Sequence, residues 1–193
     1  MTSTSIDRVA IALTQTPTLI SFPTDTVPAL ATLPRQANLI YEAKRRPPAK
    51  PLILMGASLA DLQPYVSGSD AERAIWKNTT DAHWPGQLTL VLPASDRTPK
   101  TLNPQSTGTI GIRVPNHPAA LALLARTGPL ATTSANLSGQ PPLTDPSAIA
   151  QTFPTALIVS SETEPALSSG QPSTVARWTG SGWEILRQGK VKL

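Results

Sequence analysis

Cations and small polar side chains stand at the expected ends of secondary-structure elements along this chain of 193 residues. They are Thr24, Lys44, Arg46, Arg113, Thr133, Ser134, Asn136, Ser173 and Arg187. Lys and Arg neutralise phosphate and carboxylate groups, and hydroxyl and amide groups orient a ligand. Asp25 is the one acid that accompanies this set. A site with so few general bases must act by positioning and charge stabilisation, as phosphoryl and nucleotidyl transfers do.

Several other kinds of chemistry are excluded by what the sequence lacks. It has no Gly-rich phosphate loop ending in Lys-Ser or Lys-Thr, and no G-x-G-x-x-G, H-E-x-x-H or G-x-S-x-G motif. It has no cysteine, so a disulfide framework, a thiolate zinc site and a cysteine nucleophile are ruled out. We interpret His83 and His117 as structural because neither is directly adjacent in sequence to a carboxylate that marks a catalytic pair. No protein-held metal site is expected.

The composition is that of an ordinary globular protein, with 39% hydrophobic residues and a length that fits one domain, residues 1–193. No apolar stretch approaches the roughly 18 residues of a membrane span. Asp7 and Arg8 interrupt the first apolar positions, unlike a signal peptide, so we expect a cytoplasmic protein. The net charge of +4 is concentrated in residues 35–50, which hold five cations and one acid. A solvated helix end would also explain this cluster.

Apolar periodicity predicts an α/β fold in which a twisted mixed parallel/antiparallel sheet is covered by helices. Several late strands are joined by connections too short for parallel crossovers, and residues 178–183 form the clearest hairpin turn. The predicted strands are residues 18–22, 51–55, 88–92, 109–114, 130–133, 156–159, 173–178 and 183–186, and the predicted helices are residues 7–13, 36–46, 58–65, 70–78, 115–126 and 145–153.

Seven short blocks in a fixed order carry a resemblance to a known family. They are residues 22–27, 44–47 with 50–52, 84–86 with 88–89, 111–115 with 117–118, 133–136 with 138–139, 172–175, and 186–189. This ordered set resembles the YrdC-type threonylcarbamoyl-adenylate synthases over nearly the whole chain. No single block is decisive, and the resemblance depends on their joint order.

The resemblance implies a YrdC-like sheet with a basic concave face and a nucleotidyltransferase reaction. L-Threonine and bicarbonate would give an N-carboxylated amino acid whose carboxylate attacks the α-phosphate of ATP. The products would be threonylcarbamoyl-AMP and pyrophosphate, and Mg²⁺ is expected with the phosphates. Partner proteins of tRNA modification would then move the threonylcarbamoyl group to the tRNA adenosine next to the anticodon. The basic face would also be available for contact with RNA.

The resemblance also implies a role for each matching residue. Lys44 and Arg46 would be catalytic, and they would bind both the threonine carboxylate and the phosphates. Thr24 and Ser173 would bind threonine. The nucleotide-binding set would comprise Lys44, Arg46, Arg113, Thr133, Ser134, Asn136 and Arg187.

Two positions depart from the family pattern. Pro28-Ala29-Leu30-Ala31 stands where the family usually has Tyr-Gly-Leu-Gly, and Arg177 stands near a position where an aspartate is common. The main alternative is therefore a YrdC-like paralogue that binds RNA or a nucleotide without this synthesis. A third reading is a carbamoyl-transfer module that acts on a different acceptor.

Overall fold

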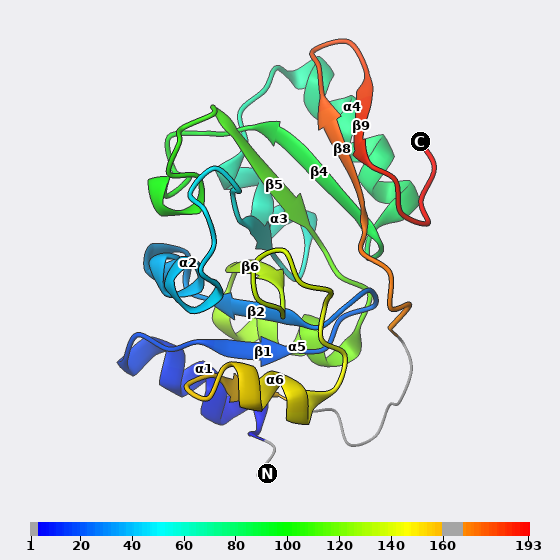
Figure 1. Ribbon diagram of the computed structural model, residues 1–193. Coiled ribbons are helices and arrows are strands. Elements are labelled where there is room, and N and C mark those ends of the chain that lie inside the picture. Colours follow the sequence, from blue (N-terminus) through cyan, green and yellow to red (C-terminus); the bar gives the residue numbers. More distant parts are fainter. Residues whose placement is uncertain (1–3, 160–167) are drawn as a thin grey trace.

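A single large sheet dominates the fold (Figure 1). The computed structural model describes residues 4–159 and 168–193, and within them nine strands pair in the order β7-β1-β2-β6-β3-β5-β4-β8-β9. Three neighbouring pairs, β1–β7, β3–β5 and β4–β8, are parallel, and the other pairs are antiparallel. The predicted mixed sheet is confirmed. The strands are β1 Ile20–Phe22, β2 Ala29–Thr32, β3 Ile53–Met55, β4 Leu88–Pro93, β5 Thr109–Arg113, β6 Leu130–Ser134, β7 Leu157–Ile158, β8 Thr174–Trp178 and β9 Trp183–Arg187.

The helices fall close to the predicted segments, but α2 and α3 are shorter than predicted and α4 is longer. They are α1 Ile6–Gln15, α2 Asn38–Lys44, α3 Leu59–Leu62, α4 Asp70–His83, α5 Pro118–Thr127 and α6 Pro146–Thr152. Short 3-10 turns occupy Pro34–Gln36, Gln63–Tyr65 and Lys100–Leu102. Helix α4 was expected to end near residue 78 but runs to His83. It ends there because Pro85 disfavours the helical conformation for the residue before it, and Trp84 is extended.

Two apolar clusters pack the helices on opposite faces of the sheet. The larger contains Leu54, Leu90 and Ile112 from the central strands, packed with residues of α2, α4 and α6. The smaller joins α1 and α5 to β1, β2, β3 and β6, through contacts that include Phe22 and Met55. Among the described residues, the smaller cluster takes nothing from β4, β5 or β8. The helices on that side therefore leave part of the central sheet open.

Strand β2 was not predicted from the sequence. Its four residues, Ala29–Thr32, are all buried, and it pairs with β1 on one side and β6 on the other. Alanine is depleted in strands, and no alternation of apolar and polar residues marks the segment. Small side chains suit this position because Ala29 and Ala31 lie in the cluster formed with α1 and α5. Tertiary packing here overrides local preference.

Helix α4 begins with a reciprocal cap whose contribution can be measured. The Ser69 hydroxyl accepts the N–H of Glu72 at 3.3 Å, and the Glu72 carboxylate accepts the N–H of Ser69 at 2.9 Å. We expect Ser69→Ala to lower the free energy of unfolding by about 1 kcal/mol, because a helix-terminal N–H loses its acceptor. Urea denaturation measures the change, with the exposed Ser67→Ala as the control. Equal stability of the two variants would contradict this prediction.

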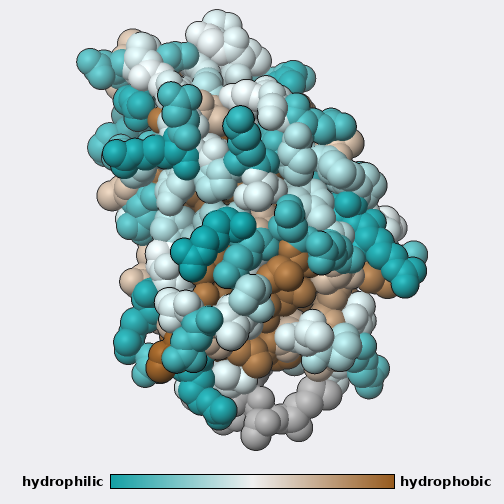
Figure 2. All heavy atoms as spheres, turned by 90° about the vertical axis from the view of Figure 1, so that its left-hand side faces the viewer, coloured by the Kyte–Doolittle hydropathy of each residue, from teal (hydrophilic) through white to brown (hydrophobic). Residues whose placement is uncertain are grey.

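Among the residues that the structure describes, no helix is both long enough and apolar enough to cross a membrane. Figure 2 shows one face of the molecule as mostly hydrophilic, with an apolar area in its lower half.

Candidate active site

A cavity of about 220 Å³ lies over the central strands, where the α1 and α5 layer ends. Its walls come from β2, β3, β4, β5, β6, β8 and β9 and from the loops that precede β2, β3 and β8. The cavity thus gathers side chains from both ends of the sequence. Of the predicted site residues it brings together Arg46, Arg113, Thr133, Ser134, Ser173 and Arg187.

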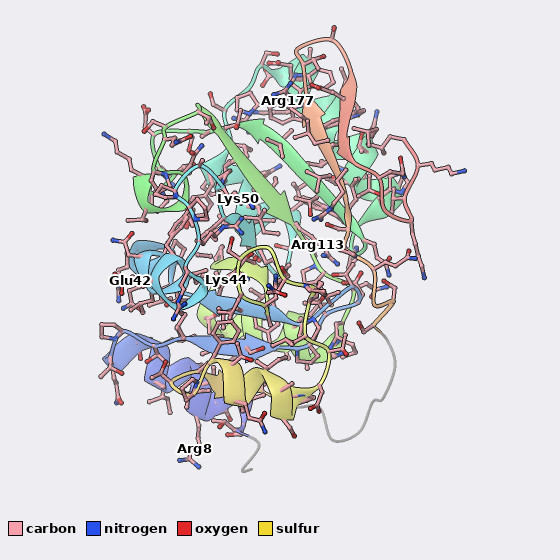
Figure 3. The ribbon with its side chains drawn as sticks, in the orientation of Figure 1. Arg8, Glu42, Lys44, Lys50, Arg113 and Arg177 are labelled. Carbon is pink, nitrogen blue, oxygen red and sulfur yellow. The ribbon has the colours of Figure 1, made fainter. Side chains whose placement is uncertain are left out.

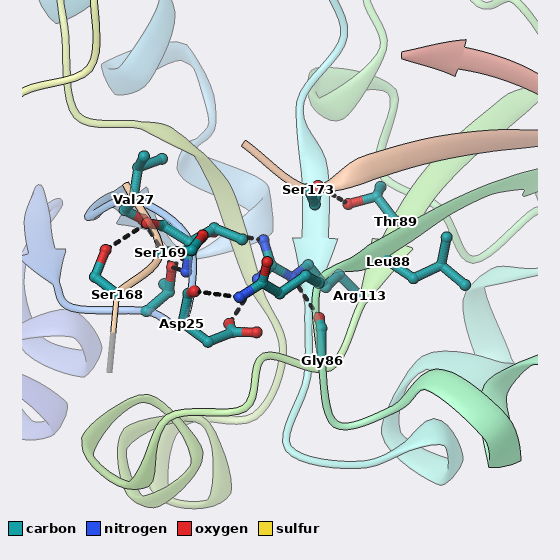
Figure 4. Close-up of polar contacts among 12 residues, drawn as sticks. Asp25, Val27, Gly86, Leu88, Thr89, Arg113, Ser168, Ser169 and Ser173 are labelled. Atoms are coloured by element: carbon teal, nitrogen blue, oxygen red, sulfur yellow. Dashed lines mark hydrogen bonds and ion pairs between the residues drawn. The ribbon is translucent and has the colours of Figure 1, made fainter. Parts of the chain in front are cut away.

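Arg113 is the most firmly held cation of the cavity (Figure 4). It ends β5 and is only 3% exposed. Its Nε donates to the carbonyl of Gly86 at 2.9 Å, and Nη1 donates to the Thr26 hydroxyl at 2.9 Å. Its Nη2 forms an ion pair with Asp25 Oδ1 at 2.6 Å. The guanidinium is therefore fixed from two loops before any ligand arrives.

Arg46 and Arg187 are held in a similar way on other walls of the cavity. Arg46 donates from Nε to the carbonyl of Lys50 at 2.8 Å and from Nη2 to that of Pro51 at 3.0 Å. Arg187 donates from Nε to the carbonyl of Ser173 at 2.9 Å and from Nη2 to its hydroxyl at 3.2 Å. In each of the three arginines the Nε is tied to a main-chain carbonyl, so terminal N–H groups remain for a ligand.

The electrostatics of the cavity favour an anion. In residues 4–159 and 168–193, Arg113 forms an ion pair with Asp25, whereas Arg46 and Arg187 form none. Burial, as the leading cause, lowers the pKa of each guanidinium, and the loss of solvation is greatest for Arg113, which is buried, whereas Arg46 is partly buried and Arg187 is exposed. Arginine keeps its proton at physiological pH, so the deficit remains. A phosphate or carboxylate group can relieve it through paired hydrogen bonds.

Hydroxyl groups complete the polar lining, and three of them belong to residues outside the predicted site set. The Ser173 hydroxyl lies 2.8 Å from that of Thr89, and both residues line the cavity together with Thr26 and Thr132. Thr26 and Thr132 had been grouped with the polar residues at element ends but were given no binding role, and Thr89 was read only as part of a strand. Alternation was a further signal for Thr132, which shares a face of β6 with Ser134 because side chains two apart on a strand point the same way.

Lys44, which ends α2 (Figure 3), and Asn136 are not among the residues that line this cavity. Lys44 is 1% exposed, and its Nζ donates to the carbonyls of Ser134 (2.5 Å) and Asn136 and to Asn136 Oδ1 (3.1 Å). The Ser134 hydroxyl donates to the same Oδ1 at 2.5 Å. Lys44 thus uses all three N–H donors to hold the turn after β6. Burial, and secondarily Arg46, lower the pKa of Lys44 to about 7.

Thr24 is also placed away from the cavity. Its side chain is fully buried, and its hydroxyl donates to the carbonyl of Val27 at 2.7 Å and accepts the N–H of Thr26 at 3.1 Å. These bonds close the turn between β1 and β2, a common use of a threonine hydroxyl. Of this turn, Thr26 and Val27 line the cavity, and the Thr26 hydroxyl accepts Arg113 Nη1.

Comparison with known protein families agrees with this site, in which polar groups from distant parts of the chain meet in one cavity. The model of the Sua5/YciO/YrdC family, described as "Telomere recombination", matches residues 12–189. The chain belongs to this family. The YrdC-type resemblance and the YrdC-like fold are thereby confirmed. In the Sua5/YciO/YrdC fold of this chain, the cavity lies beside the blocks that carried the resemblance.

Two relatives in the Sua5/YciO/YrdC family bear the name threonylcarbamoyl-AMP synthase. The one from Bacillus subtilis is 41% identical over 139 residues, which are 68% of this chain and 38% of that protein. The one from Xanthomonas axonopodis pv. citri is 37% identical over 147 residues, which are 74% of this chain and 77% of that protein. The chain therefore spans well under half of the first relative and about three quarters of the second.

A solved structure shares the fold closely. P. abyssi Sua5 in complex with L-threonine superimposes with a TM-score of 0.80 at 29% identity, covering 96% of this chain and 55% of that one. The similarity extends across almost the whole of the chain, and the longer Sua5 protein has a further part outside the match.

Proposed function

We propose that this chain is an L-threonylcarbamoyladenylate synthase, which forms threonylcarbamoyl-AMP and pyrophosphate from L-threonine, bicarbonate and ATP. The observation that carries the proposal is the convergence of Arg46, Arg113 and Arg187 on one cavity with hydroxyl groups between them. The names of the two synthase relatives and the threonine bound to P. abyssi Sua5 support the choice of substrates. The product would serve tRNA modification in the cytoplasm, where partner proteins transfer the group.

The proposed chemistry suits a site built from cations and hydroxyls. The attacking group is the carboxylate of N-carboxythreonine, which is already an anion, so its attack on the α-phosphate needs no general base. The oxygen–phosphorus bond to the leaving pyrophosphate breaks as the new one forms, and negative charge shifts to the leaving group. Arg46 and Arg187, which have no carboxylate partner among the described residues, would stabilise this charge. Their fixed Nε groups reduce the reorganisation required.

The substrate amino acid would be oriented by the hydroxyl groups. Thr26, Thr89 and Ser173 offer donors and acceptors at the cavity wall. Thr24 would act on threonine indirectly, by closing the turn that presents Thr26. Lys44 and Asn136 would likewise act on the nucleotide by holding Ser134.

Mg²⁺ would enter this site with ATP. The described part of the chain contains no group of three or more His, Cys, Asp and Glu that could hold a metal ion. The cavity is lined by guanidinium and hydroxyl groups, which do not fit the carboxylate and water ligands that Mg²⁺ prefers. The triphosphate would be its main ligand.

Arg46→Ala is expected to reduce threonine-dependent pyrophosphate release by at least about 100-fold, since a preorganised donor to developing charge is lost. The assay uses purified protein with ATP, Mg²⁺ and bicarbonate, with and without L-threonine. Arg8→Ala is the matched control, because Arg8 is exposed on α1 and points away from Lys44 and Arg113 in Figure 3.

Release that does not depend on threonine would contradict the proposal. The alternative of a nucleic-acid-binding paralogue predicts a different result: RNA affinity that falls steeply with salt through counterion release and does not respond to threonine. The alternative is favoured by Ala29, which lines the cavity at a position where the family usually has glycine.

A further inference from the structure

We propose that Asp25 is a positioning residue for this reaction, which sets the orientation of the Arg113 guanidinium and lowers the affinity of the cavity for anions. The inference rests on the proposed synthase function and adds a residue that does not itself line the cavity. The Asp25 carboxylate has two separable effects. Its hydrogen bond helps to fix the plane of the Arg113 guanidinium, and its negative charge offsets the positive charge of Arg113.

Asp25 is held from its main chain as well as from its side chain. Its carbonyl accepts the Gln87 Nε2 amide at 2.7 Å and the N–H of Ser169 at 3.0 Å. Gln87 directly follows Gly86, whose carbonyl accepts Arg113 Nε. The loop before β2 and the turn before β4 are thus linked to each other and to Arg113, as Figure 4 shows for part of this group.

The donors of Arg113 identify what Asp25 controls. A guanidinium has five N–H groups, and Gly86, Thr26 and Asp25 each take one. One N–H remains on Nη1 and one on Nη2, and Arg113 lines the cavity. The bond from Nη2 to Asp25 Oδ1, at 2.6 Å, is charge-assisted, so it is the strongest of the three restraints. It therefore contributes most to holding the guanidinium plane, and with it the direction of the remaining N–H of Nη2.

The environment of Asp25 is difficult to explain by stability alone. The residue is 4% exposed, and its Oδ2 has no hydrogen-bond partner within the residues described. Burying two charges and leaving a carboxylate oxygen unpaired is unfavourable, and apolar pairs of similar volume are often at least as stable. Such departures from good local packing are expected at functional sites. We infer that the Asp25 charge is retained for its effect on Arg113 at the cavity.

Removing the hydrogen bond and removing the charge therefore have different consequences. Without an acceptor at Oδ1, Arg113 keeps its bonds to Gly86 and Thr26 but loses its one charge-assisted bond, so the guanidinium plane is held less rigidly. Turnover should fall because the transition state needs oriented donors. Without the negative charge, the net charge at Arg113 becomes more positive. An anion should then bind more tightly, since a repulsive neighbour is gone.

Two variants and one control separate these effects. Asp25→Ala removes both the acceptor and the charge, whereas Asp25→Asn removes the charge and keeps an acceptor oxygen. We expect kcat for threonine-dependent pyrophosphate release to fall at least about tenfold in Asp25→Ala and to recover most of that loss in Asp25→Asn. Both variants should bind inorganic pyrophosphate about three- to tenfold more tightly by calorimetry. Asp7→Ala, in an exposed ion pair with Arg126, should change neither quantity.

The pyrophosphate-binding measurement and a double variant distinguish a folding defect from a loss of positioning. Loss of kcat together with weaker pyrophosphate binding would assign Asp25 a structural role only and overturn the proposal. Unchanged kcat in Asp25→Ala would overturn it as well. In an Arg113→Met background, adding Asp25→Ala should leave the residual kcat/KM unchanged, because Asp25 acts through Arg113. A further loss there would overturn the proposal by showing that Asp25 acts directly.

The proposed function and this inference can fail separately. If the unmodified protein releases no pyrophosphate in response to threonine, the synthase proposal fails while the pyrophosphate affinities still test the charge effect. If the unmodified protein is active and Asp25→Ala has the same kcat, the synthase proposal stands and the positioning role fails.

Discussion

Arg113→Met is expected to lower the free energy of unfolding by about 3–5 kcal/mol, because it leaves a buried carboxylate without its counter-ion. Asp25 is 6% exposed in its side chain and Arg113 is 3% exposed, so water cannot replace the lost partner. One oxygen of Asp25 already lacks a hydrogen-bond partner among the described residues, and the substitution orphans the other. The carbonyl of Gly86 loses its donor too. Urea denaturation at neutral pH measures the change.

Two further variants test this explanation. Asp25→Leu added to Arg113→Met should restore most of the lost stability, since no buried charge then remains. Lys77→Met removes one partner of an ion pair that is 62% and 57% exposed, and it should change stability by less than about 1 kcal/mol. A loss in Arg113→Met that the second substitution fails to reverse would assign the effect to packing around the guanidinium instead of to charge.

The fold was predictable from the sequence wherever a segment carried its own signal. Proline and N-cap residues bounded helices correctly, and Asp145 caps α6 as expected by accepting the N–H of Ala148 at 3.0 Å. Strand β2 escaped prediction because its alanines and leucine have no strand-like pattern, and only pairing with β1 and β6 makes the segment a strand. The full length of α4 was missed because its last turns are polar.

The candidate site was predictable as a set of residue types but not as a set of contacts. The sequence indicated that distant cations and hydroxyls would converge, and Arg46, Arg113 and Arg187 do so. It could not indicate that Thr26 lines the cavity and Thr24 does not, because this depends on the turn that the Thr24 hydroxyl closes. It also could not indicate that Lys44 would donate to main-chain carbonyls 90 and 92 residues away.

Buried Lys44 also makes the stability of the protein depend on pH in a way that can be isolated. Its pKa is lowered from 10.5 to about 7, mainly by burial. Below the lower value both the folded and the unfolded chain bind the proton, so the penalty of burying the charge is fully present. Between the two values the unfolded chain binds about one more proton than the folded chain, so stability rises with pH. Above the higher value neither binds it, and the penalty is gone.

Lys44→Met removes this titration and keeps a long apolar side chain. The stability of the unmodified protein relative to Lys44→Met should therefore rise between about pH 8 and pH 10, with a slope of about 1.4 kcal/mol per pH unit. Other titrating groups cancel in the difference because both proteins share them. Urea denaturation over a series of pH values gives the slope. A flat difference for Lys44→Met would mean that the carbonyls of Ser134 and Asn136 keep the ammonium protonated throughout, since a charged amine offers them one more N–H than a neutral amine.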